Sequence, residues 1–117
     1  MRKILWQSQH EPLAIQLQEL QRLFGAVEVE QNPRPFSSAE EIEKRYKQGM
    51  YNDLVVVAPL SVIARLCELQ LRPLWAEMEQ LPPERREEAH LSYRGRHYRF
   101  AGFRRVQAVK VEFTEVF

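Results

Sequence analysis

Apolar residues recur at the spacing of one helix face in the segment that follows the first ten residues. Leu13, Leu17, Leu20 and Phe24 lie four, three and four positions apart, and residues at these spacings share one side of an α-helix. A proline precedes the run and a glycine follows it, as is common at the first turn and just past the last turn of helices. The pattern predicts a helix over residues 13–24.

Apolar runs of other kinds predict the strands and the remaining helices. Residues 26–31 alternate between apolar and polar side chains, which is typical of a strand with one solvated face. Residues 53–59 form a continuous apolar and β-branched run, which favours a strand covered on both faces. Two overlapping capping boxes at residues 37–41 predict the start of a helix. The elements expected up to residue 80 are strands over 3–7, 26–31, 53–59 and 72–79, and helices over 13–24, from the capping boxes to about 48, and over 60–69.

Strands and helices therefore alternate along the first part of the chain in the order β-α-β-α-β-α-β. Short connections between such elements favour parallel neighbours with right-handed crossovers. We expect an α/β fold: a small Rossmann-like three-layer α/β/α core with a mainly parallel sheet, plus a C-terminal antiparallel β-hairpin extension. The strand order stays open, and if it is 2-1-3-4 the order reverses between the first and third strands. Residues 1–117 are expected to form a single domain, with the parallel core in 1–80 and the antiparallel extension in 90–117.

The extension has a different residue pattern from the core. Tyrosine, arginine and phenylalanine interleave in it, and the pair Arg94-Gly95 predicts the turn of a hairpin. Gly102 is expected to allow a second reversal of the chain. Residues 106–117 alternate again, with valine and phenylalanine on one face, and predict a further strand.

The continuous strand and the two most apolar helices predict the core. Because both faces of the 53–59 run need cover, the residues expected to be buried are Val55, Val57, Ile63, Leu66, Leu17 and Leu20. The helix over 60–69 is apolar on almost every side, and such a helix is buried by its sheet or by a second chain. We therefore expect a homodimer, and the alternative is that the C-terminal hairpin covers this helix.

Composition narrows the class of protein. Hydrophobic residues make up 44% and charged residues 28% of the 117 positions, as in ordinary globular proteins. No apolar run approaches the ~20 residues of a membrane-spanning helix, so we expect no membrane partner. A single cysteine cannot form an intrachain disulfide, which favours a reducing compartment and a cytoplasmic protein.

The net charge of +1 conceals a split along the chain. Residues 91–117 carry six basic and two acidic side chains, net +4, whereas the remainder carries 11 basic and 14 acidic ones, net −3. A basic segment of this kind attracts anionic partners, or it keeps an exposed sheet soluble and blunts its edge. The small total charge argues against sequence-specific binding of duplex DNA.

Ligands of open parallel sheets bind at the carboxyl ends of the strands, where the strand order reverses. Polar side chains follow the first strand, a serine follows the third, and arginines of the hairpin reach the same edge if the hairpin folds back. The candidate ligand-binding residues are Gln7, Gln9, Ser61, Arg96 and Arg99, and the candidate catalytic residues are Ser8 as nucleophile and His10 as base. His10 has a second interpretation, as a histidine that caps the next helix or meets solvent.

The expected ligand is phosphorylated or nucleotide-like, because a helix start and arginine side chains favour an anion. No glycine-rich dinucleotide loop and no P-loop is present, so binding of NAD-type dinucleotides or of ATP is not expected. Neither a metal nor a cofactor is expected. Three scattered histidines and one cysteine lack zinc spacing, and Glu77 and Glu79 form a pair typical of a solvated strand face.

The layout of about the first 80 residues resembles the CARF-type domain of CRISPR-associated proteins. The similarity lies in the architecture and in the polar end of the first strand, Gln7 to His10. This resemblance implies binding of a cyclic oligoadenylate over the carboxyl ends of the strands, generally by a dimer.

Two hypotheses of function follow. In the first, the chain is a small intracellular α/β module that binds, and in one version cleaves, a phosphorylated or nucleotide-like ligand. In the second, it is a non-enzymatic interaction module, such as a small inhibitor or adaptor, that uses exposed strands or the apolar third helix. The first predicts a polar, concave pocket holding the candidate residues, whereas the second predicts apolar area open to solvent.

Overall fold

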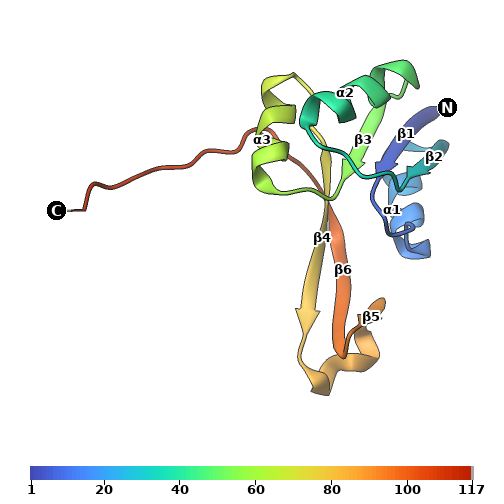
Figure 1. Cartoon of the computed structure of the whole chain (residues 1–117). Coiled ribbons are helices and arrows are strands. Elements are labelled where there is room, and N and C mark those ends of the chain that lie inside the picture. Colours follow the sequence, from blue (N-terminus) through green and yellow to red (C-terminus); the bar gives the residue numbers. More distant parts are fainter. Residues whose placement is uncertain (117) are drawn as a thin grey trace.

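Strands and helices alternate over the first two thirds of the chain in the computed structural model, which describes residues 1–116 (Figure 1). No helix within those residues is long and apolar enough to cross a bilayer. The elements are β1 (Arg2–Gln7), α1 (Ala14–Phe24), β2 (Val27–Asn32), α2 (Ala39–Gln48), β3 (Asp53–Val56), α3 (Leu60–Glu68), β4 (Leu74–Leu81), the 3-10 helix η1 (Pro83–Glu88), β5 (Leu91–Tyr93) and β6 (Arg96–Arg105).

One six-stranded sheet runs through the molecule in the order β2-β1-β3-β4-β6-β5. The first four strands are parallel in the order 2-1-3-4, which the sequence left open, whereas β4–β6 and β6–β5 are antiparallel pairs. The α/β class is therefore confirmed. The sheet is mixed and curled rather than mainly parallel, so the description as Rossmann-like applies only loosely.

Helices cover both faces of the parallel part, because the side chains of its central strands alternate between two apolar clusters. Leu54 and Val56 pack with α2 and α3 on one face, and Val55 packs with α1 on the other. The predicted burial is confirmed for Val55, Ile63, Leu66 and Leu20. It is wrong for Val57, which is 62% exposed because β3 already ends at Val56, and Leu17 is only half-buried.

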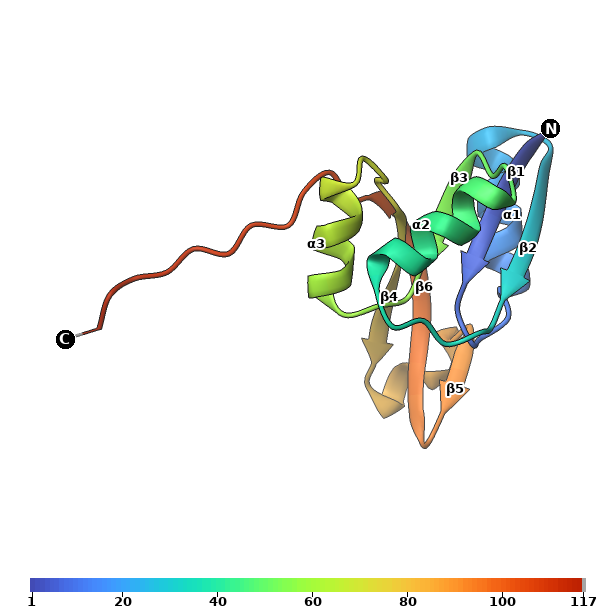
Figure 2. The same cartoon turned by 45° about the horizontal axis from the view of Figure 1, so that its top comes forward.

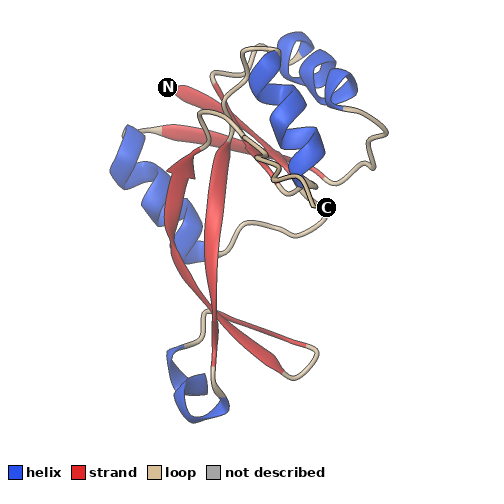
Figure 3. Ribbon diagram, turned by 90° about the vertical axis from the view of Figure 1, so that its left-hand side faces the viewer, coloured by secondary structure: helices blue, strands red, loops and turns tan. Residues whose placement is uncertain are grey.

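An antiparallel arm extends from this body, because β4 has twice the length of β3 and pairs with β6 over all of it. Figure 3 shows the arm leaving the helices, with η1 at its far end. The register shifts between Glu77 and Met78, which face Gly102 and Phe100 and leave Ala101 as the extra residue of a bulge. The predicted reversal at Gly102 is wrong, since this glycine, with φ +135, lets β6 continue through the bulge.

The predicted hairpin turn between β5 and β6 is confirmed. Arg94 and Gly95 both have positive φ angles, 50 and 75. Two such residues form a turn whose twist matches that of the flanking strands.

The expected strand over 106–117 is wrong for its described part, and Phe117 lies outside the described residues. Residues 107–116 contain no strand and lead away from the body (Figures 1 and 2). Alternation makes a strand only where a neighbouring strand offers an edge to pair with. After Val106, whose N–H donates to the carbonyl of Pro73, the chain leaves the sheet, so residues 107–116 meet no strand. Only Val106 and Val109 pack back onto the body, against the α3 cluster.

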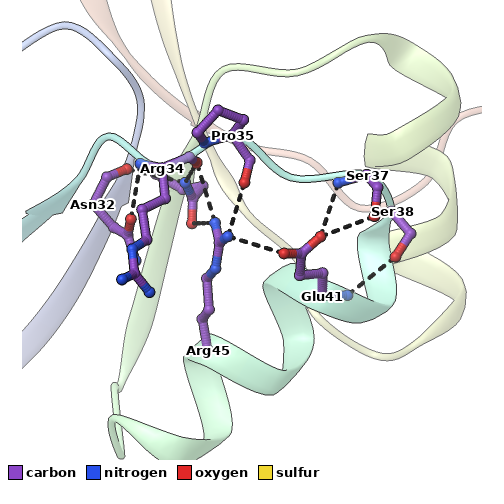
Figure 4. A network of polar contacts seen from close by, with 8 residues as sticks. Asn32, Arg34, Pro35, Ser37, Ser38, Glu41 and Arg45 are labelled. Atoms are coloured by element: carbon purple, nitrogen blue, oxygen red, sulfur yellow. Dashed lines mark hydrogen bonds and ion pairs between the residues drawn. The ribbon is translucent and has the colours of Figure 1, made fainter.

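Two side chains of the predicted capping segment, Ser38 and Glu41, cap the start of α2. The Ser38 hydroxyl accepts a bond from the Glu41 N–H, and the Glu41 carboxylate accepts bonds from the N–H and hydroxyl of Ser37, at 2.8 and 3.0 Å (Figure 4). The backbone N–H of Ser37, followed by its hydroxyl, lowers the pKa of the Glu41 carboxyl. This carboxylate therefore favours the folded state while it is ionised.

Glu41→Gln is expected to lower the free energy of unfolding at pH 7 and to lose that effect in acid. A lowered folded-state pKa contributes stability that is complete above the ordinary value of 4.5 and disappears as the pH falls through the lowered one. Urea denaturation at pH 7 and pH 3 measures this difference. Glu84→Gln on the exposed 3-10 helix is the matched control. Its free energy of unfolding is expected to equal that of the wild type at both pH 7 and pH 3. An equal loss for Glu41→Gln at both values would contradict the role of its charge.

Candidate functional site

A cavity of about 530 Å³ lies at the carboxyl ends of β1 and β3 and continues along the first half of β4. We call it the edge groove. It opens at the place where the switch-point rule puts a site, since α1 and α3 lie on opposite sides of the sheet there. Its lining residues are Trp6, Ser8, His10, Glu11, Leu13, Gln16, Val56, Val57, Ala58, Ile63, Trp75, Ala76, Met78 and Leu91.

The edge groove exists because neighbouring strands differ in length. β3 pairs with β4 only at Val55 and Leu74, and the chain then leaves the sheet to begin α3. From Trp75 onward, β4 is paired with β6 on one side and has no strand on the other. Successive strand residues point to opposite faces, yet Trp75 and Ala76 both line the groove. The groove therefore lies against the edge of β4, where a longer β3 would run.

The lining is largely apolar and aromatic. Trp75 and Leu91 are partly open to solvent, 39% and 40%, and Trp6 and Met78 lie deeper. Among the lining residues the only charged side chain is that of Glu11, and there is no lysine or arginine. Such a lining favours an apolar, neutral or basic occupant.

Ser8 and His10 lie at this edge of the sheet, as predicted, and both line the groove. The Ser8 hydroxyl accepts a bond of 3.1 Å from the backbone N–H of His10, and the Trp6 indole donates to the His10 carbonyl at 2.9 Å. The imidazole stands edge-on to the ring of Tyr93, 6.2 Å between centroids. The hydroxyl thus closes the turn after β1 rather than meeting the imidazole, and the catalytic roles of both residues remain predictions.

Both polar atoms of the Gln7 side-chain amide are hydrogen-bonded within the fold. Its Nε2 donates to the carbonyls of Asn32 and Arg34, and its Oε1 accepts a bond of 3.1 Å from Arg45. Arg45 also donates to the carbonyls of Arg34 and Pro35 (Figure 4). The buried amide therefore ties β1 to the segment after β2 and to α2.

A second cavity, of about 320 Å³, adjoins the edge groove and shares Ser8, His10 and Val57 with it. Gln9 lines it, as does Arg34. Arg34 gives only backbone atoms to the neighbouring network, and its guanidinium points away from that network (Figure 4). This cavity therefore has a cation within reach, which the edge groove lacks.

Ser61, Arg96 and Arg99 line neither cavity. Ser61 is exposed in the first turn of α3 and Arg96 is exposed beside the hairpin turn. Arg99 donates to Glu79 at 2.9 Å and lies 3.9 Å from Glu88. The structure thus brings Gln7, Ser8, Gln9 and His10 together around the second cavity, whereas Ser61, Arg96 and Arg99 line neither cavity.

The carboxylates of β4 have cationic neighbours across the ladder. Glu77 pairs with Arg104 and Glu79 pairs with Arg99. Within residues 1–116 no three histidine, cysteine or acidic side chains gather in a way that could hold a metal. Glu77 and Glu79 therefore form ion pairs with β6 on the exposed face of β4.

Sequence reasoning missed the apolar members of the groove and Arg34. Arg34 directly follows β2 at the same edge of the sheet, so applying the switch-point rule to the second strand would have found it. Trp6, Trp75 and Leu91 are far apart along the chain, and only the curl of the sheet brings them to one cavity. No local pattern signals that convergence.

Comparisons with protein families, with curated proteins and with solved structures find no match to this chain.

Proposed function

We propose that the chain is a non-enzymatic interaction module that binds an extended segment of a partner along β4. One observation carries this proposal: β4 has eight residues and β3 four, so most of one β4 edge is unpaired beside an apolar cavity. An unpaired strand edge presents N–H and C=O groups that can accept another strand. Adding a peptide strand to such an edge is a common mode of peptide recognition.

The two walls of the edge groove supply the specificity that backbone bonds lack. A strand seated against β4 directs alternate side chains to opposite faces. One set would meet Leu13, Met78 and Leu91, and the other set would meet Trp75 and the α3 side. The wall of Leu13, Met78 and Leu91 is apolar, whereas β4 presents Glu77 and Glu79 beyond Trp75 on the opposite face. The bound segment therefore carries apolar residues at the alternating positions that meet the first wall, has polar residues between them, and avoids acidic residues next to Glu11.

A nucleotide-like ligand is the second candidate, and the second cavity favours it. Gln9, His10 and Arg34 line this cavity at the carboxyl ends of β1 and β2. The Arg34 guanidinium can bind a phosphate, and a base can enter the aromatic groove next to it. Cleavage of that ligand would require His10 to act as a base on it. The loosely Rossmann-like core and the similarity to CARF-type domains belong to this candidate.

Titration of the isotopically labelled chain with a synthetic peptide tests the first candidate. The probe is a seven-residue peptide in which valine alternates with threonine and lysine, and amide NMR shifts report the binding site. We expect shifts at residues 75–81, with slower hydrogen exchange there, because the added strand occupies the free edge. Leu91→Asp is expected to weaken binding about tenfold, since it puts a charge into the groove at a position that tolerates exposure.

Two controls accompany the titration. Leu23→Asp, an equally exposed leucine outside the lining of the groove, is expected to bind like the wild type. A peptide with N-methylated amides, which cannot donate to β4, is expected not to bind. Shifts confined to residues 9–10 and 34 on addition of ATP or a cyclic oligoadenylate, with no response to the peptide, would instead support the nucleotide-like ligand.

A further inference from the structure

We propose that the segment bound in the edge groove is Lys110–Val116 of a second copy of this chain, an inference that rests on the proposed function. It gives the interaction module a specific partner: its own sequence in another molecule. The two copies would exchange these segments reciprocally.

The segment has the pattern of a strand and no strand to pair with. Val109, Val111 and Phe113 alternate with polar residues, yet residues 107–116 form no strand in their own chain. Val111 is 69% exposed and Phe113 is 91% exposed. Apolar side chains that are exposed at regularly alternating positions indicate a surface that binds a partner.

The segment matches the free edge of β4 in length and the edge groove in its apolar positions. Lys110–Val116 has seven residues, and so does the part of β4 beyond its pairing with β3, Trp75–Leu81. Val111 and Phe113 supply the alternating apolar side chains that the wall of Leu13, Met78 and Leu91 requires. Lys110 at one end of the segment can pair with Glu11 of the lining, and in that register Glu112 and Glu115 lie further along β4, away from Glu11.

The path of the chain favours a second copy over the groove of the same molecule. Val106 donates to the carbonyl of Pro73, just before β4 begins, and Val109 packs against the α3 cluster. Val106 thus lies on the β6 side of β4, opposite its free edge, and Val109 lies against α3, after which the segment leaves the body (Figures 1 and 2). A two-fold exchange would fill two grooves with two segments and leave none unpaired.

Sedimentation equilibrium of the full chain at micromolar concentration tests the exchange. The wild type is expected to be a dimer, and Phe113→Asp is expected to raise the dimer dissociation constant about tenfold or more, because it removes the largest apolar contact. Leu23→Asp, at an exposed leucine outside both the segment and the lining of the groove, is the control and is expected to remain dimeric. A monomeric wild type, or a Phe113→Asp variant that dimerises like the wild type, would overturn the inference.

A second measurement separates this inference from the proposed function. The labelled Phe113→Asp chain is titrated with a synthetic peptide of residues 107–116, and shifts at residues 75–81 are expected. If the valine–threonine peptide shifts these amides and the 107–116 peptide does not, the exchange is wrong and the proposed function stands. If neither peptide shifts them, both are wrong. Protection of the segment that is independent of concentration would show binding to its own groove and would also overturn the exchange.

Discussion

Val55→Asp is expected to abolish cooperative folding. Val55 lies on the central strand β3, has no exposed surface, and packs with Ile4 and Leu20 in the cluster under α1. The cluster around Val55 consists of hydrophobic side chains, so a new carboxylate has no cation to pair with inside it. An unpaired buried charge costs several kcal/mol. Since the whole stability of a domain of this size is about 5–15 kcal/mol, circular dichroism and urea denaturation should show an unfolded or molten chain.

Val57→Asp is the matched control. It makes the same substitution two residues further on, at a side chain that is 62% exposed. Substitutions of exposed residues usually change stability by about 0.5 kcal/mol or less, so Val57→Asp should unfold cooperatively near the wild-type midpoint. A Val55→Asp variant that melts like Val57→Asp would contradict the two-sided burial of β3.

Arg105→Leu is expected to lower the free energy of unfolding by about 2 kcal/mol. Arg105 at the end of β6 donates to both carboxylate oxygens of Asp53 at the start of β3, at 2.6 and 2.9 Å. The Asp53 side chain is only 5% exposed. Without Arg105, the one ion pair that this buried carboxylate keeps among the described residues is with Arg2, whose guanidinium lies 3.4 Å away. Breaking a fully buried pair costs about 3–5 kcal/mol, and one third of the Arg105 side chain faces solvent, which reduces the effect.

The bond to Asp53 is also the main reason why the pKa of Arg105 is raised, against the opposing effect of burial. Arg104→Leu is the control, because Arg104 pairs with Glu77 at an exposed site, where ion pairs contribute about 0–1 kcal/mol. Urea denaturation of the two variants gives the comparison. Equal losses of stability would show that the pair with Asp53 does not tie β6 to the parallel part of the sheet.

Local patterns were sufficient for the elements of the core. The spacing of Leu13 to Phe24 predicted α1, and the apolar run within 53–59 predicted a strand covered on both faces, of which β3 forms the first four residues. The Arg94-Gly95 pair predicted the hairpin turn. In each case the determining interactions lie within a few residues of one another, so the sequence alone carries them.

The candidate site was predictable only in part, for the same reason. Ser8 and His10 directly follow β1, so the strand end places them at the carboxyl edge. Ser61, Arg96 and Arg99 depended on how a helix and an arm are oriented, and the structure directs them elsewhere. Side chains that meet through tertiary orientation cannot be assigned to one site from their positions in the chain.

The amino-acid pattern by itself determined the alternation of strands and helices up to β4 and the burial of the central strand, whereas the strand order 2-1-3-4 came from the structure. Only the tertiary structure decided where β3 stops, how far β4 runs beyond it and whether residues 107–116 find a strand to pair with. The physical reason is that a strand's length depends on hydrogen-bond partners supplied by other strands, whereas its apolar pattern depends only on its own residues. The edge groove is the consequence of that difference, since it arises from two neighbouring strands of unequal length.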